Sequence, residues 1–228
     1  MKGVNIMENE LWGLIYRKEK QNPIIDSEYA MYELPFYKDG EYMSNLENFI
    51  RFVNGVKKMV RKSKYYRNYV RYIKFDIGLN KCQILSNIEE IEDEDKGIIE
   101  MHHGPILSLF DIIAIITDDF LSRGVPVNSF MVAKEVIKCH YENMVQVVML
   151  SETVHEAVEQ YGGIFLSNKQ AFGDLNAFLK KYRRGLQQDQ IEKINRYIEL
   201  SKQYDTFDKD LLKLEKNIRH WSDDIIFY

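Results

Sequence analysis

The sequence predicts an α+β fold that is mostly helical and contains two short apolar strands. The first strand is expected at 98–103, where it ends in two adjacent histidines, and the second at 144–150. Apolar residues at helical spacing predict two helices between the strands, at 105–121 and 130–140, and a third helix at 152–161. The expected order is therefore strand, two helices, strand and helix.

Further elements flank this central unit. Apolar residues that recur every three or four positions predict a helix over 46–72, and alternating residues predict a strand over 70–77. Another strand is expected at 82–88, and 169–217 is expected to form two or three helices. Residues before 46 show no long period, which predicts short strands or irregular structure.

We expect three regions along the chain. Residues 1–88 form an N-terminal region with a basic helix and strand, residues 89–165 contain the two adjacent histidines, and residues 166–228 are helical. The central region begins with an acidic run from Glu89 to Asp95, which we expect to be a solvated loop.

Composition limits the class of protein. The chain has 228 residues, of which 45% are hydrophobic and 29% are charged, with a net charge of −4, and these values are typical of a globular protein with a sizeable core. Cys82 and Cys139 form no CxxC pair, which argues against a cysteine-based zinc ribbon or a disulfide scaffold. The longest apolar run, 106–116, contains Asp111 and is too short to span a bilayer. No signal-peptide core follows the N-terminus, so we expect a cytoplasmic location and no membrane partner.

Four residues in the central region carry possible chemistry. His102 and His103 end the first strand before Gly104-Pro105, Asn143 opens the second strand, and His155 lies one turn into the following helix. Adjacent residues of a strand point to opposite faces, so the two histidines can serve different partners only where the strand ends and bends. This order, over about 60 residues from 98 to 160, resembles the finger of the HNH endonuclease family, the ββα-metal fold.

The resemblance implies a role for each of these residues. His102 and His155 stand where the family has its metal ligands, and His103 stands where it has its general-base histidine. Asn143 matches the asparagine that orients this base. The implied cofactor is Mg²⁺ or Mn²⁺, with Zn²⁺ as a further option, and Glu159 is a candidate oxygen ligand on the same helix.

Phosphodiester hydrolysis explains why such residues are needed together. A divalent cation stabilises the charge on the pentavalent phosphate and on the leaving 3′ oxygen, while a neutral imidazole activates the attacking water. A side-chain amide fixes the orientation and tautomer of that imidazole. The fold that the resemblance implies is a ββα-metal finger with a two-helix insertion, embedded in a mostly helical protein.

The same residues also have purely structural interpretations. His102 and His103 fit a pair at a strand end, with one ring buried and the other exposed. Asn143 fits the C-cap of the preceding helix, and its long separation from His103 exceeds the family's usual loop. His155 fits an ordinary histidine on a helix face, and His140 is expected to be structural.

A basic stretch lies outside this motif. From Arg51 to Lys74 there are nine Lys or Arg and no Asp or Glu. A charged stretch is usually a solvated face, but the absence of acids also fits a surface that binds phosphate groups. Its densest part predicts a nucleic-acid-binding set that consists of Arg61, Lys62, Lys64 and Arg67. Residues 180–184 are a weaker candidate.

The resemblance leads to an expected function with two alternatives. We expect a metal-dependent HNH-type endonuclease that hydrolyses DNA phosphodiester bonds, with a phage origin that would place it in the host cytoplasm. The first alternative is a catalytically silent protein that keeps the HNH scaffold for binding a protein partner, such as a phage inhibitor or accessory protein. The second alternative is a structural zinc module.

Overall fold

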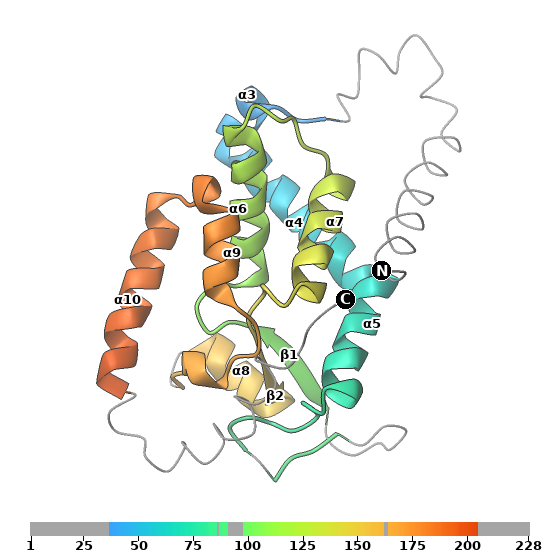
Figure 1. Cartoon of the computed structure of the whole chain (residues 1–228), viewed down its shortest axis with the longest axis vertical. Helices are drawn as coiled ribbons and strands as arrows, with labels where there is room; N and C mark the ends of the chain where they lie inside the picture. Colours follow the sequence, from blue (N-terminus) through green and yellow to red (C-terminus); the bar gives the residue numbers. More distant parts are fainter. Residues whose placement is uncertain (1–36, 86, 91–97, 162–163, 205–228) are drawn as a thin grey trace.

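A computed structural model describes residues 37–85, 87–90, 98–161 and 164–204 of the chain. Within these residues, a mostly helical arrangement surrounds one two-stranded antiparallel sheet (Figure 1), so the predicted α+β class is confirmed. The elements predicted before residue 37 and after residue 204, and most of the predicted acidic loop, lie outside the described residues.

The sheet joins two segments that lie far apart in the sequence. Strand β1 (Ile99–His103) pairs antiparallel with β2 (Val147–Ser151), which confirms both central strands. The other edge of β2 is closed by Gln83, whose backbone N–H donates to the Met149 carbonyl at 2.8 Å. The Gln83 side chain in turn accepts the Met149 N–H at 2.6 Å. Every residue of β2 is buried, as expected for a strand that is covered on both edges and faces.

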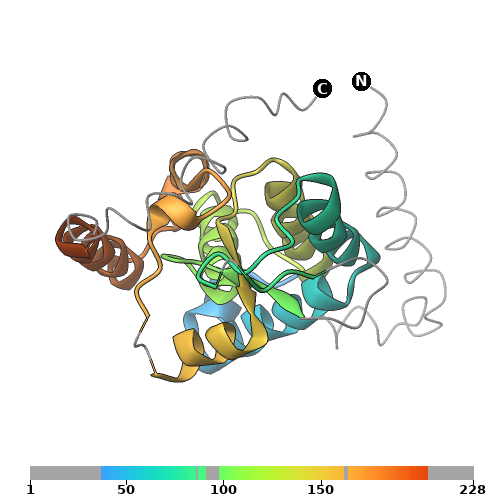
Figure 2. The same ribbon diagram turned by 90° about the horizontal axis from the view of Figure 1, so that it is seen from below.

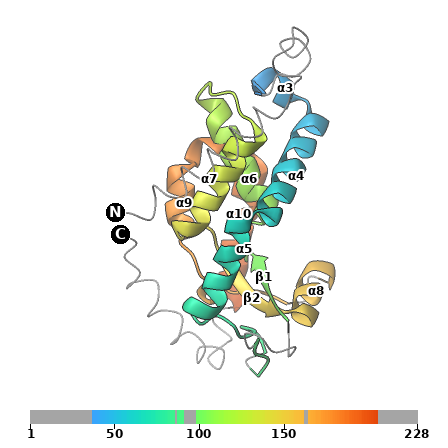
Figure 3. The same ribbon diagram turned by 90° about the vertical axis from the view of Figure 1, so that its right-hand side faces the viewer.

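Two helices replace the single helix predicted over 46–72. They are α4 (Leu46–Lys62) and α5 (Lys64–Arg71). Ser63 ends α4 and also caps α5, because its side chain accepts the Tyr66 N–H at 3.0 Å. Figure 3 shows that α5 continues α4 in a nearly straight line along one side of the molecule.

The strands predicted at 70–77 and 82–88 are wrong. Tyr72–Asp76 forms a π-helical turn that extends α5. Tyr69, Ile73 and Ile77 are buried, whereas Arg71 is exposed and Phe75 is half-buried, so burial recurs every four residues, as on a helix face, and not every two, as in a strand. Residues 82–85 and 87–88 are in irregular structure that is flanked by an isolated bridge between Lys81 and Glu89.

The two helices predicted between the strands are confirmed as α6 (Leu109–Ser122) and α7 (Ser129–Tyr141). Helix α6 begins at Leu109 and not at Pro105, because Ser108 forms a capping box with the third helical residue. Asn128 caps α7, because its side chain accepts the Met131 N–H at 2.9 Å. Figure 1 shows α6 and α7 above the sheet, and α6 supplies the most buried side chains, Ile112, Ile113, Ile115 and Ile116.

The remaining helices complete the described chain. Helix α8 (Glu152–Tyr161) follows β2 directly and matches its predicted bounds. The short helices are α3 (Gly40–Ser44), η2 (Asn168–Gln170), α9 (Leu175–Lys181) and η3 (Arg183–Gly185), and the last helix is α10 (Gln188–Tyr204). Figures 1 and 2 place α10 and α5 on opposite sides of the molecule.

One hydrophobic core holds these elements together. It runs from Met43 to Tyr182 and takes buried residues from each of the three regions expected from the sequence. Among the described helices, none is long and apolar enough to cross a membrane.

Candidate functional site

The β1–β2–α8 unit brings His102 and His155 together. Because α8 follows β2 without a loop, it turns back beside β1 and places His155 against the middle of that strand. The two imidazole rings meet edge to face, with their centroids 5.0 Å apart. These are the two residues for which the sequence predicts a shared ion.

Glu100 belongs to the same cluster and was missed from the sequence. It lies two residues before His102, so both side chains are on one face of β1, and this period of two was the available signal. Nδ1 of His155 donates a hydrogen bond to the Glu100 carboxylate. A carboxylate only accepts, so the proton of His155 is on Nδ1, and a neutral ring then has its lone pair on Nε2.

This arrangement can orient an imidazole but does not form a closed metal site. Carboxylates hold metal-binding histidines in the same way, through the nitrogen that does not bind the metal. However, no group of three or more His, Cys, Asp or Glu in the described part of the chain is arranged to hold an ion. Glu100 bonds to His155 instead of sharing a central point with both histidines. The side chain of Glu159 lies outside what the structure describes.

His103 points to the opposite face of β1 from His102 and is buried, with 7% of its surface exposed. Its Nε2 lies 3.0 Å from Nε2 of His140 on α7. Nδ1 of His140 lies 2.7 Å from the Val136 carbonyl oxygen, which only accepts, so this nitrogen has the proton. When His140 is neutral its Nε2 is therefore an acceptor, and Nε2–H of His103 donates to it.

Aromatic rings enclose the two buried histidines. Tyr66 stacks on His103 with centroids 6.0 Å apart, and Tyr69 contacts His140 edge to face at 5.1 Å. Burial lowers the pKa of His103 well below its usual value, with smaller contributions from His140 and Arg61. Burial also lowers the pKa of His140 to about 4. Both rings are therefore neutral near pH 7, and the Nε2 proton of His103 is directed into the core.

Asn143 lies at the end of α7 and has the left-handed backbone conformation, with φ 55°. Its N–H donates to the His140 carbonyl at 3.0 Å, and its carbonyl accepts the Asp174 N–H at 2.7 Å. Asparagine is one of the few residues other than glycine that adopt this conformation readily. Its Oδ1 is buried without a hydrogen-bond partner, and the structure forms no bond between this side chain and His103. This placement fits the C-cap interpretation.

The basic stretch lies along α4 and α5. Its two ends take part in ion pairs, since Arg51 contacts Glu47 at 2.6 Å and Lys74 contacts Glu90 at 2.7 Å. The middle is exposed and forms no ion pair with a described acid; it consists of Lys58, Arg61, Lys62, Lys64 and Arg67. The four predicted nucleic-acid-binding residues therefore share one stretch of surface.

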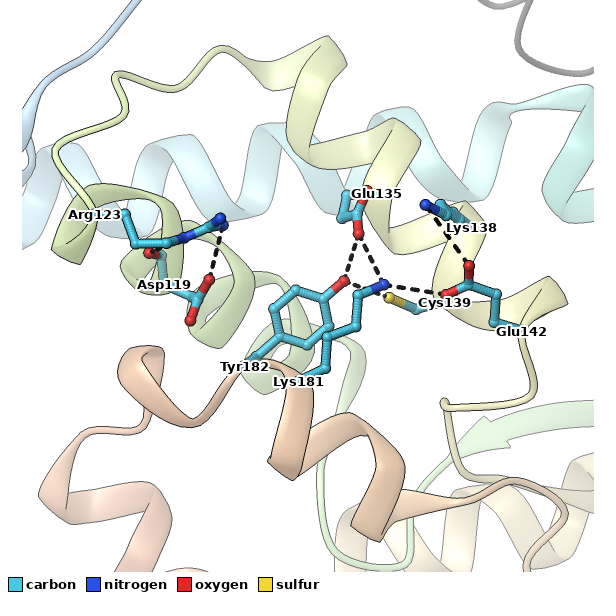
Figure 4. Close-up of polar contacts among 8 residues, drawn as sticks. All are labelled: Asp119, Arg123, Glu135, Lys138, Cys139, Glu142, Lys181 and Tyr182. Atoms are coloured by element: carbon cyan, nitrogen blue, oxygen red, sulfur yellow. Dashed lines mark hydrogen bonds and ion pairs between the residues drawn. The ribbon is translucent and has the colours of Figure 1, made fainter. Parts of the chain in front are cut away.

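The weaker basic candidate, 180–184, is partly used within the fold. Lys181 lies 3.1 Å from Glu135 of α7 and 3.1 Å from Glu142 directly after α7, and Figure 4 shows both contacts. The Tyr182 hydroxyl is buried and donates to Glu135 at 2.6 Å. These contacts fasten α9 to α7, which leaves fewer cations available to a ligand than on α4 and α5.

Cys139 lies within the same group of contacts. Its Sγ is 3.0 Å from the Tyr182 hydroxyl oxygen. Burial raises the pKa of the thiol to about 12, so it stays protonated at neutral pH. Cys139 is therefore a small core residue and not a reactive thiol. The same view shows Arg123 paired with Asp119 at 2.9 Å near the end of α6.

The described residues define a mostly helical α+β protein in which two helices lie between the two paired strands in the sequence and a third helix follows the second strand. The family of bacteriophage G278-like virion proteins matches residues 5–224, and the chain belongs to this family. No curated protein and no solved structure gives a match. The family match does not test the resemblance to HNH endonucleases, which stays a prediction.

Proposed function

We propose that this chain is a component of the phage particle. Its β1–β2–α8 unit binds a protein partner and does not hydrolyse DNA. The family match over residues 5–224 supports a place in the particle. The observation that argues against hydrolysis is the buried hydrogen bond between His103 and His140. This proposal corresponds to the accessory-protein alternative derived from the sequence.

The position of His103 is unsuited to activating a water beside a bound ion. A general base needs a free lone pair within hydrogen-bond reach of that water. Because Nε2 of His103 donates to His140, the lone pair is on Nδ1, but the ring is buried and lies on the face of β1 opposite to His102. An ion held by His102 and His155 would therefore be separated from His103 by the strand itself.

The place in the particle is tested by following the chain through particle purification. Phage particles are banded on a density gradient, and the chain is quantified by mass spectrometry against a known capsid protein. We expect it to band with the particles at a constant copy number after nuclease treatment and a high-salt wash. Its absence from washed particles, combined with its presence in the infected-cell lysate, would contradict the proposal.

The metal-dependent endonuclease is the second candidate, because His102 and His155 meet beside Glu100. In this account His102 and His155 hold Mg²⁺, Mn²⁺ or Zn²⁺, and the ion supplies a Lewis acid for the phosphate of bound DNA. His103 becomes the base only if the end of β1 rearranges and frees its ring from His140. Asn143 would then orient that ring.

Titration calorimetry with Mn²⁺ tests the two proposed ligands. His102→Ala and His155→Ala should each weaken Mn²⁺ binding, whereas Glu156→Gln, an exposed change on the same helix, should not. Equal Mn²⁺ binding by the parent and both histidine variants removes these residues as ligands. A parent that does not bind Mn²⁺ removes this candidate altogether.

A further inference from the structure

The exposed middle of the basic stretch places five cations within ten residues, at the end of α4 and on α5, and we call this set the α4–α5 basic face. It consists of Lys58, Arg61, Lys62, Lys64 and Arg67. On each helix these residues are three or four positions apart, so they lie on one side of that helix. At 1.5 Å per residue the row is roughly 14 Å long, and a DNA duplex has one charge per ~1.7 Å, so several phosphates lie within its reach.

Helix stability does not explain this arrangement of charges. Lys64 and Arg67 lie in the first turns of α5, whose first turn contains no acid, although the N-terminus of a helix favours negative charge. Like charges three or four residues apart also repel each other. The first turn of α4, by contrast, contains an acid, Glu47, which pairs with Arg51 one turn later.

The positive potential of this surface reaches into the protein. Burial is the main cause of the lowered pKa of His103, and Arg61 and Lys57 lower that pKa further. A ligand that brings negative charge would relieve the repulsion along both helices.

The side chains around the basic face favour a duplex backbone over other polyanions. Helices that lie on membranes need exposed apolar residues beside their cations, and none of the exposed large apolar residues falls between 57 and 71. Single strands are held by stacking on exposed aromatic rings, but Tyr65 and Tyr69 are buried. Arginine and lysine together suit phosphate oxygens without reading base edges.

From these observations we infer that the α4–α5 basic face binds the phosphate backbone of double-stranded nucleic acid without sequence preference. This inference goes beyond the proposed function, because it needs neither the His102–His155 pair nor a place in the particle. It also explains how a chain with a net charge of −4 can approach DNA, since five exposed cations that form no ion pair with a described acid lie on α4 and α5.

Fluorescence anisotropy with the full chain and a labelled duplex of arbitrary sequence tests the inference. The affinity is measured over a range of KCl concentrations for the parent and for a fourfold variant, Arg61→Gln, Lys62→Gln, Lys64→Gln and Arg67→Gln. The variant should bind about tenfold more weakly or worse at ~0.1 M salt, and its log–log salt slope should fall by up to ~0.9 for each phosphate that it no longer neutralises. Glutamine retains the helix propensity of both helices.

A second fourfold variant is the matched control. It removes the same charge from exposed positions on α9, η3 and α10, through Lys180→Gln, Arg183→Gln, Arg184→Gln and Arg196→Gln. Figures 1 and 2 place α10 on the side of the molecule opposite to α5. The control should keep the parent's affinity and salt slope. Equally weakened binding by both variants would show that only net charge matters, and would overturn the inference.

A footprint on the unmodified chain provides a second readout that does not depend on any variant. Bound duplex should protect Lys62 and Lys64 from acetylation, as measured by mass spectrometry, but should leave Lys180 fully reactive. Absence of duplex binding by the parent, or protection of these lysines only by anionic phospholipid vesicles or by an acidic peptide, would overturn the inference.

Discussion

At the scale of single residues, the different surroundings of His102 and His103 follow from strand geometry. Neighbouring side chains on β1 point in opposite directions, so His102 meets His155 on α8 while His103 enters the core. The sequence predicted that the two rings could separate, with one buried and one exposed. It did not predict that His103 would bond to His140, because this contact depends on how α7 packs against the end of β1.

The buried histidines predict a loss of stability in acid. The pKa of His140 is about 4 in the fold and 6.5 in the unfolded chain, so the unfolded state binds more protons as pH falls below 6.5. The free energy of unfolding should therefore decrease between pH 6.5 and 4, with a contribution from His140 on the order of 3 kcal/mol. Urea unfolding at several pH values measures this.

Replacement of His140 isolates its share of that loss. His140→Gln has no titrating ring, so its free energy of unfolding should fall less steeply between pH 6.5 and 4 than that of the parent, although it starts lower at pH 7. The slope should not vanish, because the pKa of His103 is also lowered by burial. An identical slope in parent and variant would contradict the assignment of a neutral, buried His140.

Asn143 allows a test between capping and catalysis. If its role is the left-handed end of α7, Asn143→Gly should preserve stability to within about 0.5 kcal/mol, and Asn143→Ala should cost about 1 kcal/mol or more. Thermal unfolding of both variants decides this. If Asn143 instead orients a catalytic histidine, both variants should be equally inactive in nuclease assays and should differ little in stability.

At the scale of elements, the sequence predicted the helices better than the irregular segments. The bounds of α8 and the caps of α7 were predictable because they depend on local signals such as Asn128. The predicted strand at 70–77 failed because short-range alternation there competes with the four-residue spacing of Tyr69, Ile73 and Ile77. The closure of β2 by Gln83 could not be predicted, since it joins positions 66 residues apart through a side chain.

The contact between η3 and α6 makes a prediction about Gly185. A Cβ at this position would lie 1.9 Å from the Ile115 carbonyl oxygen and 2.6 Å from the Asp119 amide nitrogen, and neither backbone group can move freely. Gly185→Ala should therefore lower the free energy of unfolding by about 1–3 kcal/mol or more. Chemical denaturation measures the change.

A matched glycine provides the control. Gly55 lies in the middle of α4, and a Cβ there would meet nothing within 4 Å. Gly55→Ala should stabilise the protein by about 0.5–1 kcal/mol, because alanine is the better helix former. If Gly185→Ala were as well tolerated as Gly55→Ala, the close approach of η3 to α6 would be wrong.

At the scale of the whole molecule, the α4–α5 basic face and the His102–His155 pair lie on different elements. The β1–β2–α8 unit contains Glu100, His102 and His155, while the five exposed cations of the basic face lie on α4 and α5. The sequence indicated the members of both groups, except Glu100 and Lys58, as candidate residues. It could not predict that the buried His103–His140 pair would lie between them, because that depends on helices α5 and α7 meeting the end of the strand.

The central claim is that this protein binds DNA and does not hydrolyse it. Incubation of the full chain with supercoiled plasmid and Mn²⁺ tests this claim most directly. On a native gel we expect the plasmid to be retarded, and after protein removal it should be recovered as fully supercoiled DNA. Metal-dependent conversion to the nicked form by the parent, abolished in both His102→Ala and His103→Ala, would contradict the account and establish the endonuclease instead.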